Sequence, residues 1–278
     1  MVKGIVNRII PFSCVDGPGN RTAIFLQGCN FNCRYCHNPE TINVCRNCSI
    51  CVKKCPYDAI TVSEGSVVWD RVNCQKCDQC LRVCPYNSSP KALWLEVDEI
   101  VAEVKKVKSF IQGITVSGGE CMLQADFLLD LFKEIKKLGL TTFVDTNGSV
   151  PFWEHKGLLE VMDMAMVDVK AYDPNEHQWL TGKDNETVIR NVEYLGDLGK
   201  LYEIRTVIVP GLLNNNYSVD AASRLLAGID PSIRYKLIKY RSLGVRKELL
   251  QSRTPSDLYM NELADIARAN GCKEIVIT

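Results

Sequence analysis

Short apolar runs alternate with longer amphipathic stretches along most of the chain. The short runs are rich in β-branched residues and predict strands, whereas the longer stretches repeat apolar residues at helical spacing. The predicted strands are Thr22–Leu26, Ile114–Ser117, Thr141–Asp145, Met164–Val169, Tyr202–Val209, Arg234–Tyr240 and Glu274–Thr278. The predicted helices are Asp98–Ser109, Gln124–Leu138, Asp184–Leu198, Val219–Leu226 and Ser256–Ala269.

Two of these helices carry recognisable end signals. Asp98 is placed to cap the first helix, and Gly139 is placed to stop the second. Strand–helix alternation of this kind is typical of a parallel sheet covered by helices. The sequence therefore predicts an α/β fold, a partial or complete βα barrel of the TIM type.

Residues 43–90 interrupt the alternation with an internal repeat. Two runs of the form C-x2-C-x2-C-x3-C-P, beginning at Cys45 and at Cys74, are displaced by 29 positions. The block has few large aliphatic residues, so its folding free energy should come largely from metal ligation. We expect a small inserted domain over residues 43–90, and a barrel formed by residues 1–42 and 91–278.

Composition narrows the choice of function. The chain has 278 residues, 46% of them hydrophobic, and 33 basic residues balance 33 acidic ones, so no charge pattern favours nucleic acid or a membrane surface. It contains no long apolar run, and its N-terminus does not resemble a signal peptide, which favours a cytoplasmic protein. In a reducing compartment, 14 clustered cysteines indicate metal binding rather than disulfides.

Cys29, Cys33 and Cys36 follow the first predicted strand. Three thiolates can bind three irons of a [4Fe–4S] cluster and leave the fourth iron open for a substrate. The alternative is a zinc ion held by the same thiolates and His37, which we disfavour because adjacent Cys36 and His37 would be strained as ligands of one tetrahedral ion. The spacing, with Tyr35 before the last cysteine, matches the radical S-adenosylmethionine (SAM) signature.

The two repeated runs match the two-cluster bacterial ferredoxin pattern, in which the fourth cysteine of each run binds the other cluster. A zinc ribbon is the alternative, but it usually has two C-x2-C pairs rather than closely spaced thiols. The ferredoxin pattern predicts one cluster on Cys45, Cys48, Cys51 and Cys84, and a second on Cys74, Cys77, Cys80 and Cys55.

Polar residues also end the later strands of the predicted sheet. In βα barrels the active site lies at the carboxyl ends of the strands, so these residues should converge on one pocket. They are Gly118, Gly119 and Glu120 after the second strand, Asp145 and Thr146 after the third, Asp168, Val169 and Lys170 after the fourth, Arg205 in the fifth and Arg241 after the sixth.

With these motifs in place, the chain resembles the glycyl-radical enzyme activating enzymes of the radical SAM superfamily, in particular the YjjW-type subgroup with a two-cluster ferredoxin-like insert. The resemblance covers nearly the whole chain. It lies in Asp16-Gly17-Pro18-Gly19, Leu26–Cys29, Tyr35–Asn38, Ser117–Glu120, Asp145–Gly148, Met166–Lys170, and Arg205 with Val209–Gly211.

The resemblance implies roles for these residues. The open iron on Cys29, Cys33 and Cys36 would chelate SAM through its amino and carboxylate groups, and Asp16 would engage the glycine loop of a protein substrate. The remaining SAM contacts implied are Gly118–Glu120 at the ammonium, Asp168 and Lys170 near the carboxylate and ribose, and Tyr35–His37 at the adenine. A monovalent cation, Na⁺ or K⁺, would be held by Asp145, Thr146, Met166 and Asp168.

The reaction implied is reductive cleavage of SAM to a 5′-deoxyadenosyl radical that takes hydrogen from a backbone glycine of a partner glycyl-radical enzyme, in the absence of oxygen. The enzyme would be a monomer with three [4Fe–4S] clusters, and flavodoxin or ferredoxin would donate its electrons. The insert would either carry these electrons to the catalytic cluster or serve only for docking. The alternatives are a radical SAM enzyme acting on a small molecule, and an electron-transfer protein.

Two positions depart from the family pattern. Arg241 stands where related activases more often have histidine, and Cys121 follows the Gly-Gly-Glu segment where a small residue or proline is commoner. We interpret Cys121, Cys14 and Cys272 as buried, unreactive thiols.

Overall fold

The structure is a computed structural model that describes residues 2–278. Its main sheet has nine strands in the order β11-β10-β9-β8-β7-β6-β2-β1-β5, and β5 and β11 form its two edges. The strands are β1 (Lys3–Ser13), β2 (Arg21–Leu26), β5 (Leu93–Glu96), β6 (Gly113–Gly118), β7 (Thr141–Thr146), β8 (Met164–Asp168), β9 (Leu201–Ile208), β10 (Arg234–Lys239) and β11 (Ile275–Ile277).

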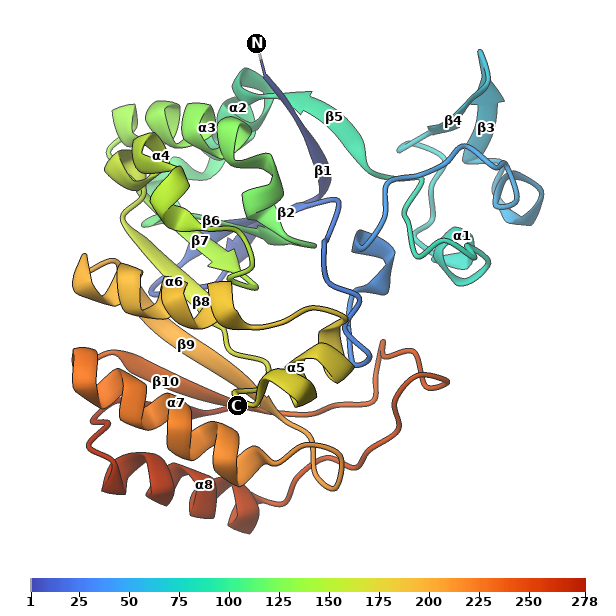
Figure 1. Cartoon of the computed structure of the whole chain (residues 1–278). Helices are drawn as coiled ribbons and strands as arrows, with labels where there is room; N and C mark the ends of the chain where they lie inside the picture. The colour runs from blue at the N-terminus through green and yellow to red at the C-terminus, as the bar shows by residue number, and fades with distance from the viewer. Residues whose placement is uncertain (1) are drawn as a thin grey trace.

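The seven strands from β2 to β11 pair in parallel, whereas β1 runs antiparallel to both β2 and β5. Because the two edges do not pair with each other, the sheet is an open, partial barrel. Figure 1 shows its successive strands turning from β1 at the top of the view to β10 at the bottom. The α/β fold predicted from the alternating pattern is therefore confirmed.

The helices cover the sheet and bury one apolar face each. They are α2 (Val97–Val107), α3 (Ala125–Lys137), α4 (Lys156–Val161), α5 (Pro174–Thr181), α6 (Glu186–Asp197), α7 (Asn215–Ile229) and α8 (Asp257–Ala269). Short 3₁₀ turns occur at Pro39–Thr41, Val52–Lys54, Lys108–Phe110, Cys121–Gln124 and Phe152–Glu154. In α3, Phe127, Leu128, Leu131 and Ile135 are buried at helical spacing against the central sheet.

All seven predicted strands exist, but the antiparallel strands β1 and β5 were not predicted. β1 contains Pro11 and has two irregularities in its register with β2, so its sequence lacks a clean alternation. Helices α4 and α5 were also missed, and α7 extends well beyond the predicted Val219–Leu226.

The predicted helix stop is confirmed and the predicted cap is wrong. Gly139 has a φ of +73°, a conformation that favours glycine. Helix α2 is capped by Glu96, not Asp98, because Glu96 and Glu99 form a reciprocal capping box directly after β5.

The segment between β2 and β5 forms a separate small unit. It contains the hairpin β3 (Ile60–Ser63) and β4 (Ser66–Trp69) and the short helix α1 (Gln79–Arg82). Its two ends meet at a bridge between Asn43 and Ser88. In Figure 1 this unit stands to the right of β1 and β5, on the opposite side of the view from α3, α6, α7 and α8.

Among residues 2–278, no helix has both the length and the apolar character needed to span a bilayer.

Candidate functional site

A cavity of about 370 Å³ lies where the carboxyl ends of the central strands meet. Its size falls within the usual range for small-molecule sites. The predicted site residues that line it are Asp16, Cys29, Cys33, Tyr35, Cys36, His37, Gly118, Gly119, Asp145, Thr146, Asp168, Lys170 and Arg205. The polar residues that end successive strands therefore converge, as the strand register predicts.

The cysteine loop that follows β2 is held in place by backbone hydrogen bonds on both sides. The amide of Cys29 donates to Ile42 O at 2.8 Å, and the amides of Asn32 and Arg34 donate to the end of α5 at 2.9 and 2.8 Å. Cys33 is buried, whereas Cys29 and Cys36 are half-buried. All three side chains face the same cavity, so they offer three sulfur ligands to one bound group.

Burial disfavours the charged forms of these three thiols. It raises the pKa of Cys29 to about 11 and that of Cys33 to about 12, and it raises the pKa of Cys36 as well. The positive charge of Lys170 opposes each of these shifts. A bound iron cluster would deprotonate the thiols outright, because metal ligation requires thiolate.

The donor set fits an iron–sulfur cluster. Within residues 2–278, no three side chains of the His, Cys, Asp and Glu types converge closely enough to hold a single metal ion. A cubane instead takes one thiolate at each of several separated corners. Nε2 of His37 lies 2.9 Å from the carbonyl oxygen of Arg241, which turns that nitrogen toward the backbone.

Two glycines allow the end of β6 to touch the cysteine loop. A Cβ on Gly118 would lie 2.2 Å from backbone atoms of Leu26, and one on Gly119 would lie 2.2 Å from Gly28 O. The backbone of Gly119 donates to Leu26 O at 3.0 Å. No other residue type could bring these two segments so close.

Glu120 lies behind the cavity rather than in it. Its carboxylate accepts hydrogen bonds from Thr146 Oγ1 at 2.7 Å, from the Asn147 amide at 2.7 Å and from the Met122 amide at 2.9 Å. The side chain is 1% exposed, and burial raises its pKa to about 7. Glu120 therefore positions the loop after β7, and its contact with a ligand ammonium stays a prediction.

Two ion pairs face the cavity from β7, β8 and β9. Nζ of Lys170 lies 2.7 Å from Asp168 Oδ2, and Nη1 of Arg205 lies 2.9 Å from Asp145 Oδ2. Both cations have raised pKa values because of nearby carboxylates, and burial raises the pKa of Asp145 although Arg205 opposes it. Two carboxylates and two cations that line one cavity can bind a ligand that carries both an ammonium and a carboxylate group.

Three other predicted residues do not line the cavity. Val169 and Met166 are buried, and Met166 Sδ accepts from Arg205 Nη2 at 2.9 Å. Arg241 is exposed, and only its carbonyl contacts the site, through His37.

Several lining residues were not singled out from the sequence. They are Phe25, Phe31, Asn38, Thr41, Ile42, Ser117, Asn147, Val207 and Ile238. Ser117 donates to Asp145 Oδ2 at 3.0 Å, and the side-chain amide of Asn147 donates to Asn30 at 3.2 Å. Ser117 and Asn147 belong to motifs already noted, but Val207 and Ile238 look like ordinary strand residues.

The cysteines of the insert face two further small cavities. Cys55, Cys74, Cys77 and Cys80 line one, and Cys45, Cys48, Cys51 and Cys84 line the other, which Cys80 also borders. These are the two groups that the ferredoxin spacing predicts, each joining three cysteines of one run to the last cysteine of the other.

The remaining cysteines differ in exposure. Cys121 is buried and its thiol donates to Asp145 O at 3.3 Å, and Cys272 is buried and donates to Ser223 O at 3.4 Å. Cys14 is exposed, so its predicted burial is wrong. It lies in the turn before β2, where no other element covers it.

Known proteins with similar sequences identify the family. Residues 23–220 match the radical SAM superfamily. The chain is 34% identical to the (2S)-3-sulfopropanediol sulfolyase activating enzyme of Bilophila wadsworthia, over 88% of this chain and 87% of that protein. It is 30% identical to the pyruvate formate-lyase-activating enzyme of Streptococcus mutans, over 87% and 80% of the two chains. It is 29% identical to the indoleacetate decarboxylase activating enzyme of Tractidigestivibacter scatoligenes, over 99% and 98%.

Solved structures share the fold at lower identity. A domain of pyruvate-formate lyase-activating enzyme from Bacteroides vulgatus superimposes with a TM-score of 0.51 and 22% identity, covering 60% of this chain and 99% of that one. SuiB from Streptococcus suis, bound to its precursor peptide SuiA, superimposes with a TM-score of 0.58 and 13% identity, covering 90% of this chain and 46% of that one.

The buried carboxyl of Glu120 predicts a pH-dependent stability. Its pKa is about 7 in the folded protein, above the ordinary value of 4.5, so folding favours the protonated form and this contribution is lost as pH rises from about 4.5 to 7. In Glu120→Gln this contribution to the pH dependence of stability should be absent. From pH 4.5 to 7, the free energy of unfolding of the wild type should therefore fall by about 1–3 kcal/mol relative to that of the variant, as measured by anaerobic urea unfolding. A difference in unfolding free energy between the two proteins that stays constant over this pH range would contradict the prediction.

Proposed function

This chain belongs to the radical SAM superfamily and, within it, to the glycyl-radical enzyme activating enzymes, and we propose that its barrel cavity binds SAM against a [4Fe–4S] cluster on Cys29, Cys33 and Cys36. The observation that carries the proposal is that these three thiols share one cavity with paired carboxylates and cations at the strand ends. The enzyme activates a partner glycyl-radical enzyme.

A [4Fe–4S] cluster held by Cys29, Cys33 and Cys36 would supply one electron at low potential to the sulfonium of SAM. The C5′–S bond then breaks to give methionine and a 5′-deoxyadenosyl radical. This radical takes a hydrogen atom from the Cα of one glycine of the partner, which leaves 5′-deoxyadenosine and a glycyl radical. Each activation thus consumes one electron and one SAM.

The residues of the chain hold the methionyl end of SAM. The Asp168–Lys170 and Asp145–Arg205 pairs offer both signs of charge from half-buried side chains of one cavity, which suits an amino acid headgroup. Tyr35 and His37, whose rings lie 6.5 Å apart, line the same cavity and suit the adenine. Holding the ligand in one orientation aligns the bond that must break.

Asp16 lines the same cavity, on a tight turn with positive φ at Gly17 and Gly19. Its side chain accepts from Ser13 Oγ, and its carbonyl accepts from Thr115 Oγ1 at 2.5 Å. We assign Asp16 to the contact with the glycine loop of the partner, because it is a cavity-lining acid that forms no ion pair with any residue from 2 to 278.

A monovalent cation beside Asp145, Thr146, Met166 and Asp168 is part of the proposal. Asp145 already contacts Arg205, so an added cation is stabilised only when the carboxylate of SAM enters the same space.

The insert, in this proposal, is a ferredoxin-like domain over residues 43–90 with two more [4Fe–4S] clusters, which relay electrons from a flavodoxin or ferredoxin.

Activation of a partner is tested directly. The protein is reconstituted without oxygen and mixed with SAM, dithionite and candidate glycyl-radical enzymes. We expect 5′-deoxyadenosine together with a glycyl radical signal in electron paramagnetic resonance, and no such signal when the partner's loop glycine is replaced by alanine. Deoxyadenosine without a radical on any candidate would instead indicate a small-molecule substrate.

The assignment of the clusters is tested by iron content. Three cubanes give about 12 Fe per chain, and Cys33→Ala should retain about 8 Fe while losing SAM cleavage completely. Cys272→Ala, which removes a buried thiol far along the chain from the three motifs, serves as the control and should keep both. About 4 Fe in the wild type, or SAM cleavage by the Cys33 variant, would refute the assignment.

The cation is tested by SAM affinity. Replacing K⁺ or Na⁺ with choline at constant ionic strength should weaken SAM binding about tenfold, or 1.4 kcal/mol. Asp145→Asn should bind SAM weakly in both buffers and lose this difference. Equal affinity of the wild type in choline and potassium buffers would exclude the cation site.

A further inference from the structure

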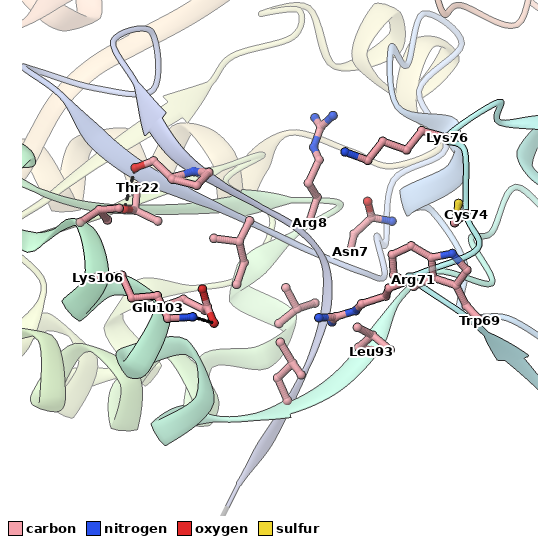
Figure 2. Close-up of a pocket in the computed structure, with 15 residues that line it drawn as sticks. Asn7, Arg8, Thr22, Trp69, Arg71, Cys74, Lys76, Leu93, Glu103 and Lys106 are labelled. Carbon is pink, nitrogen blue, oxygen red and sulfur yellow. Dashed lines mark hydrogen bonds and ion pairs between the residues drawn. The ribbon is translucent and has the colours of Figure 1, made fainter. Parts of the chain in front are cut away.

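The structure contains a second, larger cavity of about 550 Å³ between the insert and the barrel. One wall comes from β1, β5 and α2, and the other comes from the insert between Trp69 and Lys76. Figure 2 shows the side chains of both walls around it. We call this cavity the insert groove. None of the residues assigned above to SAM or to the partner's glycine loop lines it.

The insert groove is strongly basic. Arg8, Arg71, Lys76 and Lys106 line it, and all four are exposed. Its one acidic residue, Glu103, is paired with Lys106 at 2.6 Å. Arg8, Arg71 and Lys76 make no ion pair with any residue from 2 to 278. In Figure 2, the side chain of Lys76 of the insert extends toward that of Arg8 of β1. Unpaired cations gathered in one hollow attract a negatively charged partner.

The floor of the groove is apolar. Ile9, Leu93, Leu95 and Val107 line it, together with Trp69 of the insert. An apolar centre surrounded by charge is the usual arrangement of a protein-binding surface.

Cys74 connects the groove to the cysteines of the insert. It lines the insert groove and also the cavity formed with Cys55, Cys77 and Cys80. A molecule seated in the groove would therefore reach one of the proposed cluster ligands directly.

We propose that the insert groove is the docking site of an acidic one-electron carrier protein, and that the electron enters the insert through Cys74. The inference rests on the proposed function, because it needs a cluster on Cys55, Cys74, Cys77 and Cys80. The carrier loses one electron and that cluster gains it, and no covalent bond changes. Charge complementarity selects this occupant, and the modest size of the groove suits the small, transient interfaces of redox partners.

The other insert cavity is the competing entry point. Cys48, which lines it, is exposed, and Lys53 and Lys54 lie exposed between Cys51 and Cys55. These two lysines allow a matched control with the same change of charge.

The experiment compares Arg8→Glu/Arg71→Glu with Lys53→Glu/Lys54→Glu in the fully reconstituted enzyme. Reduced flavodoxin is the protein probe, and saturating dithionite is the chemical reductant. With flavodoxin at low salt, the groove variant should form 5′-deoxyadenosine at least tenfold more slowly and bind oxidised flavodoxin at least tenfold more weakly. Both losses should shrink at high salt. With dithionite, both variants should match the wild type.

Other outcomes overturn the docking site. Equal flavodoxin affinity in the wild type and the groove variant, or a greater loss in the lysine variant, would place electron entry elsewhere. A comparable loss with dithionite would show that the groove takes a small anion or supports the structure instead. Arg8→Gln/Arg71→Gln, which removes charge without reversing it, should give an intermediate loss with flavodoxin. Failure of SAM cleavage in the wild type with dithionite would contradict the proposed function, whereas the flavodoxin affinity would still test the groove.

Discussion

The close backbone contact between the end of β6 and the cysteine loop is the constraint on which the site depends. Gly118 and Gly119 lie against Leu26 and Gly28 with no room for a Cβ, and hydrogen bonds join the two segments. This contact sets the distance from the three thiols to the sheet. Glu120 then extends the same arrangement to β7 by accepting hydrogen bonds from Thr146 and Asn147. A larger residue at either glycine would separate the cysteines from the charged residues that complete the cavity.

Ion pairs join charged residues of the barrel cavity before any ligand binds. Lys170 pairs with Asp168, and Arg205 pairs with both Asp145 and Glu203, so that neither half-buried aspartate of these pairs is left without a cation. Lys170 also offsets the negative charge that three thiolates would bring, because its charge acts on all three cysteines.

Much of this arrangement could be predicted from the sequence, for a physical reason. Parallel strands place their carboxyl ends at one edge, so Asp145, Asp168 and Lys170 had to meet there once the strands were identified. The antiparallel strands β1 and β5 escaped prediction because pairing with neighbours, and not a local alternation, stabilises them. The capping of α2 by Glu96 was not predicted for a similar reason, because the position of the cap depends on where β5 ends.

The sequence by itself determined the family, the parallel sheet and the grouping of the cysteines, because ligand spacing and strand periodicity are local properties of the chain. Only the tertiary structure decided which way individual side chains point. In the folded protein, the Glu120 carboxylate accepts hydrogen bonds from the protein behind the cavity, and Cys14 is exposed. Cys74 lines two cavities. These features follow from packing between segments that are distant in sequence, and no local pattern encodes such contacts.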